Sequence, residues 1–125
     1  MIWAIALAGA AGTVARYLIS TWMPRESGAF PYSTFVINIA GSFLIALASR
    51  LLSAPDSNPM LRAALTIGFC GGFTTFSTFS AEFVALLQEG RAARALLYVM
   101  LSVGSGAIAV LAGLLLGNRL VAANG

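Results

Sequence analysis

Residues 95 to 118 form an unbroken run without a charged side chain. A run of this length can cross the hydrocarbon core of a bilayer, because a spanning helix needs about 20 apolar residues. The rest of the chain has a similar character. Hydrophobic residues make up 59% of it and charged residues only 9%, whereas a soluble domain carries about 25% charged residues. The sequence therefore predicts that lipid surrounds most of the protein.

Short clusters of turn-forming residues divide the chain into four apolar segments. The expected membrane spans cover about residues 2–22, 32–52, 60–88 and 92–119. We expect one all-α domain, 1–125, with no soluble domain. The first span is expected to be retained, because it lacks the basic flank of a signal peptide. The tail, residues 121–125, is expected to be frayed.

The third segment contains the sequence that organises the rest, GFCGGFTTFSTFSAEF at residues 68–83. Its glycines either allow close helix packing or mark a break in the helix. Hydroxyl groups follow, and they can satisfy the backbone groups that a break leaves free. We therefore expect the third span to be broken in mid-membrane near Gly71–Thr75, and we expect the break to be the functional site.

Uncharged polar side chains fall at helical spacing on three spans. They are Thr34, Asn38 and Ser42 on the second span, Thr75, Ser77, Thr78 and Ser80 on the third, and Tyr98, Ser102 and Ser105 on the fourth. Such groups usually face a bundle interior or a water path. Hydroxyl and amide donors favour an anion that must shed its water. The alternative for Asn38 is an ordinary interhelical hydrogen bond.

Phe76 and Phe79 follow the expected break, and Phe83 lies on nearly the same helical face as Phe76. A phenyl edge carries partial positive charge, so rings turned edge-inward can favour a small, hard anion. The alternative is that these rings simply pack in the core. The break offers a further option, because freed backbone carbonyls can hold a cation.

The charged residues are few, and every basic one is an arginine. Arg16 either extends to the nearby membrane interface or places a positive charge at the mouth of an anion path. Arg50, Arg62 and Arg119 lie on one side of the expected topology; Arg25, Arg91 and Arg94 lie on the other. This balance gives almost no positive-inside bias. Two opposite copies could then form an antiparallel dimer, unless other features set the orientation.

Several function classes are disfavoured by composition. The chain has no His, one Cys and four scattered acids, which argues against a zinc-type metal site and against an enzyme. The net charge of +3 does not form the clustered basic face that nucleic acid requires.

The stretch GFCGGFTTFSTFSAE resembles the Fluc (CrcB) fluoride channel family, together with the NxxGS pattern of Asn38–Ser42 and the early pair Arg16-Tyr17. The resemblance covers the whole four-span layout. It implies an antiparallel, dual-topology homodimer with two separate fluoride pores in the cell inner membrane. Such proteins passively export toxic cytoplasmic fluoride and reject chloride, and they hold a structural sodium ion at the dimer centre.

Residue by residue, the resemblance implies that the ring edges of Phe76 and Phe79 contact fluoride and that Asn38 is the pore asparagine. It implies that the backbone carbonyls of Gly71 and Thr74 bind sodium. The positions that match polar or basic ones along the fluoride pathway are Ser77, Thr78, Tyr98, Glu82 and Arg16. Ser102 and Ser105 are added from helical spacing alone.

Two rival functions remain open on the sequence. A small multidrug-type, proton-coupled exporter also has four spans and antiparallel dimers, but it needs a carboxylate in the first span, where this chain has only Arg16. Glu82 would have to serve instead. A non-transporting accessory subunit would leave the polar faces on three spans without a role.

Overall fold

The computed structural model describes residues 1–125, and all of its regular structure is helical. The all-α prediction is therefore confirmed. In chain order, the elements are α1 (Ile2–Trp22), α2 (Tyr32–Leu51), α3 (Pro59–Ala63), the π-helix η1 (Ala64–Cys70), α4 (Gly71–Phe73), α5 (Phe76–Gln88) and α6 (Ala92–Asn124).

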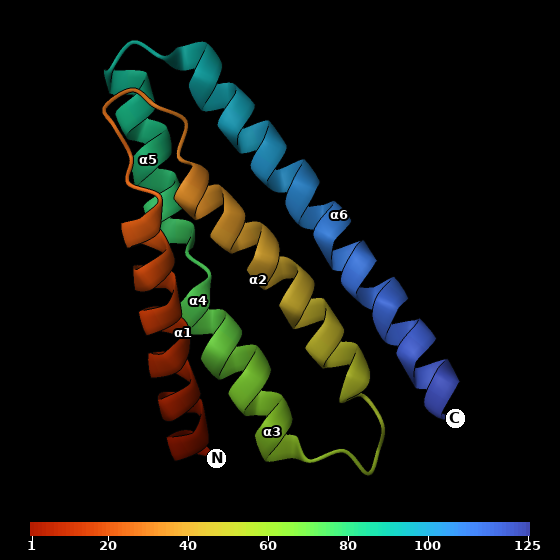
Figure 1. Cartoon of the computed structure of the whole chain (residues 1–125). Helices are drawn as coiled ribbons and strands as arrows, with labels where there is room; N and C mark the ends of the chain where they lie inside the picture. Colours follow the sequence, from red (N-terminus) through yellow and green to blue (C-terminus); the bar gives the residue numbers. More distant parts are fainter.

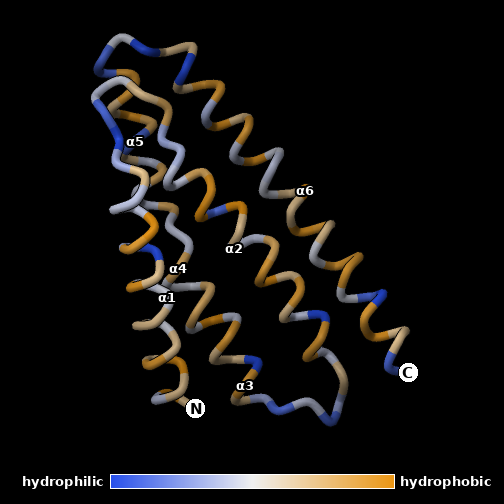
Figure 2. The backbone as a smooth tube through the Cα atoms, viewed as in Figure 1, coloured by the Kyte–Doolittle hydropathy of each residue, from blue (hydrophilic) through white to orange (hydrophobic).

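The chain runs along the length of the molecule in α1, in α2, in the series α3, η1, α4 and α5, and in α6 (Figure 1). Helices α1, α2 and α6 are each long and apolar enough to span a membrane. The remaining crossing is divided among α3, η1, α4 and α5. Both termini and the α2–α3 loop lie at one end of the molecule, and the other two loops lie at the opposite end (Figure 1). Figure 2 shows that hydrophilic residues concentrate at these two ends. The arrangement fits a four-span membrane protein with one interrupted span.

The segmented crossing has a well-defined start. The side chain of Asn58 accepts hydrogen bonds from the amides of Met60 and Leu61, and Pro59 occupies the first helical position. This is a favourable N-terminus, because the cap satisfies free amides and proline has no amide to satisfy. Beyond Ala63 the helix widens into the seven-residue π-helix η1. Helical segments of this kind are rare and are often found at functional sites.

Two close helix contacts hold the bundle together. Helix α1 packs against η1 and α4, and α2 packs along α6. At the first contact, a Cβ on Gly72 would collide with the carbonyl oxygen of Gly9 and lie 2.9 Å from Thr13 Oγ1. At the second, a Cβ on Gly113 would lie 2.5 Å from the Phe43 carbonyl oxygen. Small residues thus let the backbones approach closely, as is common in membranes.

The buried core is small. Only 17 of 125 residues are buried, so most apolar side chains face outward, as expected for a chain surrounded by lipid or by a partner. A cluster of Leu86, Ala95 and Tyr98 is completely buried, and it lies where α5 meets α6. The C-terminal tail differs from the expectation. Residues 121–124 are helical because they continue α6 without a breaking residue, so the prediction of a frayed tail is wrong up to Asn124.

Candidate functional site

The helix break lies at Thr74 and Thr75. Both residues have extended backbone conformations, with ψ 158° at Thr74 and φ −148° at Thr75. Helix α4 ends just before them, and α5 begins just after them at Phe76. The Thr75 side chain caps α5 by accepting a hydrogen bond of 3.2 Å from the Thr78 amide. The break therefore falls within the range expected from the sequence, at its C-terminal edge.

Asn38 on α2 binds both backbone groups of Thr75. Its Nδ2 donates to the Thr75 carbonyl oxygen at 3.1 Å, and its Oδ1 accepts from the Thr75 amide at 2.8 Å. A side-chain amide can do this because it carries both a donor and an acceptor. In a lipid environment these backbone groups would otherwise lack partners. Asn38 thus stabilises the extended conformation of the break.

Arg16 on α1 contacts the other side of the break. Its Nε donates to the Gly72 carbonyl oxygen at 3.1 Å, and the Thr13 hydroxyl donates to the same oxygen at 3.4 Å. A cation at the C-terminal end of a helix also interacts favourably with the helix dipole. Neither of the two interpretations of Arg16 made from the sequence, an interface residue or a charge at a pore mouth, predicted this contact with the Gly72 carbonyl.

A polar groove opens beside the break, with a volume of about 370 Å³. Its lining comes from α2, the interrupted span and α6, and consists of Asn38, Gly41, Ser42, Ile45, Cys70, Gly71, Thr74, Thr75, Phe76, Phe79, Ser102 and Val103. The structure thus brings together six predicted site residues from three separate segments of the chain: Asn38, Gly71, Thr74, Phe76, Phe79 and Ser102. Arg16 and Ser105 are not among the lining residues.

The two phenylalanines of the groove differ in environment. Phe76 is 80% exposed in the single chain, so core packing within this chain does not explain it. Phe79 is partly buried against the Leu86–Ala95–Tyr98 cluster. Its ring meets the Tyr98 ring edge-on at a centroid distance of 5.0 Å, and the Phe76 ring lies 6.0 Å from it. The packing alternative therefore describes Phe79 in part and does not describe Phe76.

Three further polar residues of α5, Ser77, Thr78 and Glu82, line a second depression of about 430 Å³, whereas Ser80 does not. It is lined by Arg25, Ser77, Thr78, Ala81, Glu82 and Ala85. The buried Tyr98 connects this depression to α6, because its hydroxyl donates to Glu82 Oε1 at 3.2 Å. Thr78 connects it to the break, because its hydroxyl lies 3.0 Å from that of Thr75. Several of the predicted polar residues are thus divided between two depressions.

The two serines predicted on α6 are placed differently. Ser102 lines the polar groove, and its buried hydroxyl oxygen has no hydrogen-bond partner. A buried hydroxyl without a partner is costly, so this group is free to bind something in the groove. Ser105 lies one turn further along α6 and lines none of the depressions described here.

The break leaves backbone carbonyls free. The Thr75 amide bonds to Asn38, so it does not bond to the Gly71 carbonyl oxygen as a continuous helix would require. No backbone amide bonds to the Thr74 carbonyl oxygen either. Unwound backbone carbonyls of this kind suit Na⁺ in membrane proteins. The donor set at Gly71 and Thr74 therefore fits a sodium ion, and no cluster of His, Cys, Asp or Glu side chains competes for that role.

Three functional features were missed by reasoning from the sequence. Thr13 was not singled out, although it shares the Gly72 carbonyl with Arg16. The π-helix η1 was not foreseen. The glycines at positions 71 and 72 were considered as part of the break, yet both lie inside α4. Thr13 lies about one helical turn before Arg16, and this spacing is the sequence signal that could have identified Thr13 as a second donor to the Gly72 carbonyl.

The fold and the site define a small multi-pass membrane protein whose interrupted helix borders an uncharged, hydroxyl-lined groove. The family model for the CrcB-like protein, Camphor Resistance (CrcB), matches residues 3–114. The chain belongs to this family.

Curated relatives cover nearly the same length. A fluoride-specific ion channel of Acidobacterium capsulatum is 45% identical over 94% of this chain and 96% of its own length. One of Rhizobium meliloti is 44% identical over 90% of this chain and 92% of its own. One of Chlorobaculum tepidum is 47% identical over 86% of each. These relatives bear the name of a channel and not of an enzyme.

Proposed function

We propose that this protein is a fluoride-selective ion channel of the cell inner membrane, which lets cytoplasmic fluoride leave passively and so relieves its toxicity. The observation that carries the proposal is the exposed Phe76 ring beside the amide and hydroxyl groups of the polar groove. The family and the names of its members agree with this function.

The groups that line the groove can replace the water molecules that fluoride loses when it enters. Asn38 and Ser102 present an amide and a free hydroxyl, and the rings of Phe76 and Phe79 present partially positive edges. No lining residue is charged. An anion can therefore be stabilised without a fixed cation that would hold it too tightly to leave. Ser77, Thr78, Tyr98 and Glu82 extend the polar path along the second depression.

We further propose an antiparallel, dual-topology homodimer with two pores. In the single chain the polar groove is open and Phe76 is exposed, so an enclosed path requires a second surface. A second copy can supply it. The balance of Arg50, Arg62 and Arg119 against Arg25, Arg91 and Arg94 gives neither orientation an advantage.

The proposed sodium ion belongs to this assembly. The carbonyls of Gly71 and Thr74 would hold it, and Gly71 lies on the exposed side of α4, where a Cβ would meet nothing within 4 Å. When bound, the ion would neutralise carbonyl dipoles brought together from two chains. Its role is structural.

The exporter alternative is not favoured. Helix α1 contains no acid, and the one carboxylate in the interrupted span, Glu82, accepts a hydrogen bond from Tyr98. A proton-coupled exporter needs a carboxylate that exchanges between a proton and a drug cation.

The deciding experiment is ion efflux from liposomes that contain the purified protein. Fluoride release, followed with a fluoride electrode, should be rapid, whereas chloride release from matched liposomes should be close to that of protein-free controls. Equal rates for the two ions, or proton flux driven by a cationic drug, would refute the channel proposal.

A further inference from the structure

A third cavity lies away from the break, at the end of the molecule that holds the α1–α2 and α5–α6 loops. Its volume is about 690 Å³. Its lining is Ala29, Phe30, Tyr32, Gly90, Arg91, Ala92, Ala93, Arg94 and Leu97. We refer to it as the interfacial pocket, because α2 and α6 both begin there, at residues 32 and 92. None of its residues belongs to the proposed fluoride path.

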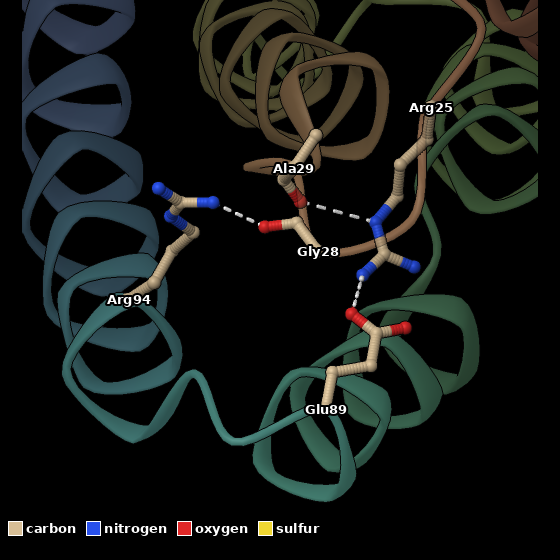
Figure 3. Close-up of polar contacts among 5 residues, drawn as sticks. All are labelled: Arg25, Gly28, Ala29, Glu89 and Arg94. Carbon is tan, nitrogen blue, oxygen red and sulfur yellow. Dashed lines mark hydrogen bonds and ion pairs between the residues drawn. The ribbon is translucent and has the colours of Figure 1, made fainter.

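The charged residues that line the interfacial pocket are both basic. Arg25, just outside it, is paired with Glu89 at 3.7 Å and donates to the Ala29 carbonyl oxygen (Figure 3). Arg94 extends from α6 and donates to the Gly28 carbonyl oxygen, a neutral acceptor that leaves its charge uncompensated (Figure 3). Arg91 has no ion-pair or hydrogen-bond partner for its side chain. Two guanidinium groups therefore line one pocket that contains no carboxylate.

The loop is shaped to fit closely around these arginines. Gly28 has a φ of +74°, which is unfavourable for residues with a side chain. A Cβ at Gly28 would also lie 3.2 Å from Arg91 Nε. Glycine thus lets the loop pass beside Arg91 while its carbonyl accepts from Arg94. Arg91 is the N-cap residue of α6 and Arg94 lies in its first turn, and both lie against Gly28.

The other walls of the pocket are apolar or aromatic. Phe30, Tyr32 and Leu97 line it, and Tyr32 and Leu97 are exposed to the surroundings of the single chain. Leu97 lies further along α6, toward the middle of that helix. A matching ligand therefore has an anionic group at the interface and an apolar body that extends into the bilayer. Basic pockets between membrane helices bind lipid headgroups in this way.

We propose that the interfacial pocket binds the phosphate headgroup of an anionic phospholipid, with Arg91 and Arg94 as its ligands. Guanidinium groups suit this role because they bind phosphate oxygens through paired, charge-assisted hydrogen bonds. A soluble anion would use the arginines alone and gain nothing from Phe30, Tyr32 and Leu97. The proposal is independent of fluoride transport.

The test is native mass spectrometry of the full-length protein from detergent that contains equal amounts of dioleoylphosphatidylglycerol and dioleoylphosphatidylcholine. Phosphatidylglycerol should remain bound in preference to phosphatidylcholine. The variant R91Q/R94Q should lose this preference by about tenfold or more, since charge-assisted hydrogen bonds are removed. The control R62Q/R119Q removes the same charge at the opposite end and should retain it.

A single variant guards against misfolding. Arg91 makes no side-chain hydrogen bond in the structure, so R91Q should fold normally and still weaken the preference severalfold. Equal retention of the two lipids, or equal loss in R62Q/R119Q, would overturn the proposal. Displacement of phosphatidylglycerol by millimolar inorganic phosphate would assign the site to a soluble anion and also overturn it. Fluoride efflux, measured in parallel, reports separately on the proposed function.

Discussion

The side-chain amide of Asn38 forms two hydrogen bonds with a single residue of the interrupted helix, Thr75, of 3.1 and 2.8 Å. This pairing replaces the helical hydrogen bonds that the break removes. It also fixes where α5 begins, because Thr75 is the residue that caps α5. Asn38 therefore has a structural role at the break in addition to its place on the polar groove.

Asn38→Asp should impair both roles. A carboxylate cannot donate to the Thr75 carbonyl, and its negative charge would repel fluoride in the groove. We expect fluoride efflux to fall by at least about tenfold and the midpoint of thermal unfolding in detergent to fall. Asn124→Asp introduces the same change at the exposed end of α6 and should alter neither measurement. Normal efflux from Asn38→Asp would contradict the proposed role.

The two phenylalanines should separate transport from stability. Phe76→Ala should reduce fluoride efflux strongly but leave the fold of the single chain intact, because this ring is 80% exposed. Phe79→Ala should reduce efflux and also destabilise the protein by about 2 kcal/mol, since its ring is partly buried.

Leucine variants distinguish a ring edge from apolar bulk. Phe76→Leu keeps an apolar side chain but has no partially positive edge. Efflux should therefore remain low in Phe76→Leu. If Phe76→Leu and Phe79→Leu both showed normal fluoride efflux, the rings would act by packing alone.

The adjacent glycines of α4 form a matched pair. Gly72→Ala places a methyl group against the Gly9 carbonyl and the Thr13 hydroxyl, and should destabilise the protein by about 1–3 kcal/mol. Gly71→Ala adds the same methyl group where nothing lies within 4 Å of it, and should leave the fold of the single chain intact. Unfolding in detergent measures the difference. Equal effects of the two variants would show that α1 does not pack as described.

The proposed dual topology can be tested by changing loop charge. Ala54→Lys with Asp56→Lys adds positive charge to the α2–α3 loop and should hold that loop in the cytoplasm. In cells that produce only this variant, one orientation should predominate and fluoride resistance should fall. Resistance should return when a second variant, biased by lysines in the α5–α6 loop, is produced with it. If labelling of the unmodified protein shows a single orientation, the dual-topology proposal fails.

The sequence was sufficient to predict where the helices lie and the region of the break. Apolar length and turn residues determine where helices can lie, and hydroxyl residues such as Thr74 and Thr75 mark where free backbone groups can find partners. It was not sufficient to predict the role of each glycine. In isolation Gly72 suggests a helix break, but in the structure it is helical and allows close contact with α1, and this contact depends on tertiary packing.

The same reasoning explains the outcome for the polar side chains. Helical spacing placed Ser102 and Ser105 on one face of α6, but only Ser102 reaches the groove. Helical spacing predicts which face of a helix a side chain lies on, but it does not predict how far along that face a cavity extends. For Arg16, the sequence suggested either an interface position or a pore mouth. It did not predict the hydrogen bond to the Gly72 carbonyl, because the two residues are distant in the chain and are brought together only by the fold.

Each portion of the interrupted span is attached to a different neighbour. The α1 side chains of Arg16 and Thr13 hold α4, Asn38 of α2 holds the break itself, and Tyr98 of α6 holds α5 through Glu82. The interrupted span is therefore held by hydrogen bonds from three different helices. Substitutions in one of these helices can change the tilt of one half-helix, or the width of the passage, while the hydrogen bonds to the other two helices remain. A channel this small can thus diverge in conductance while its overall architecture stays the same.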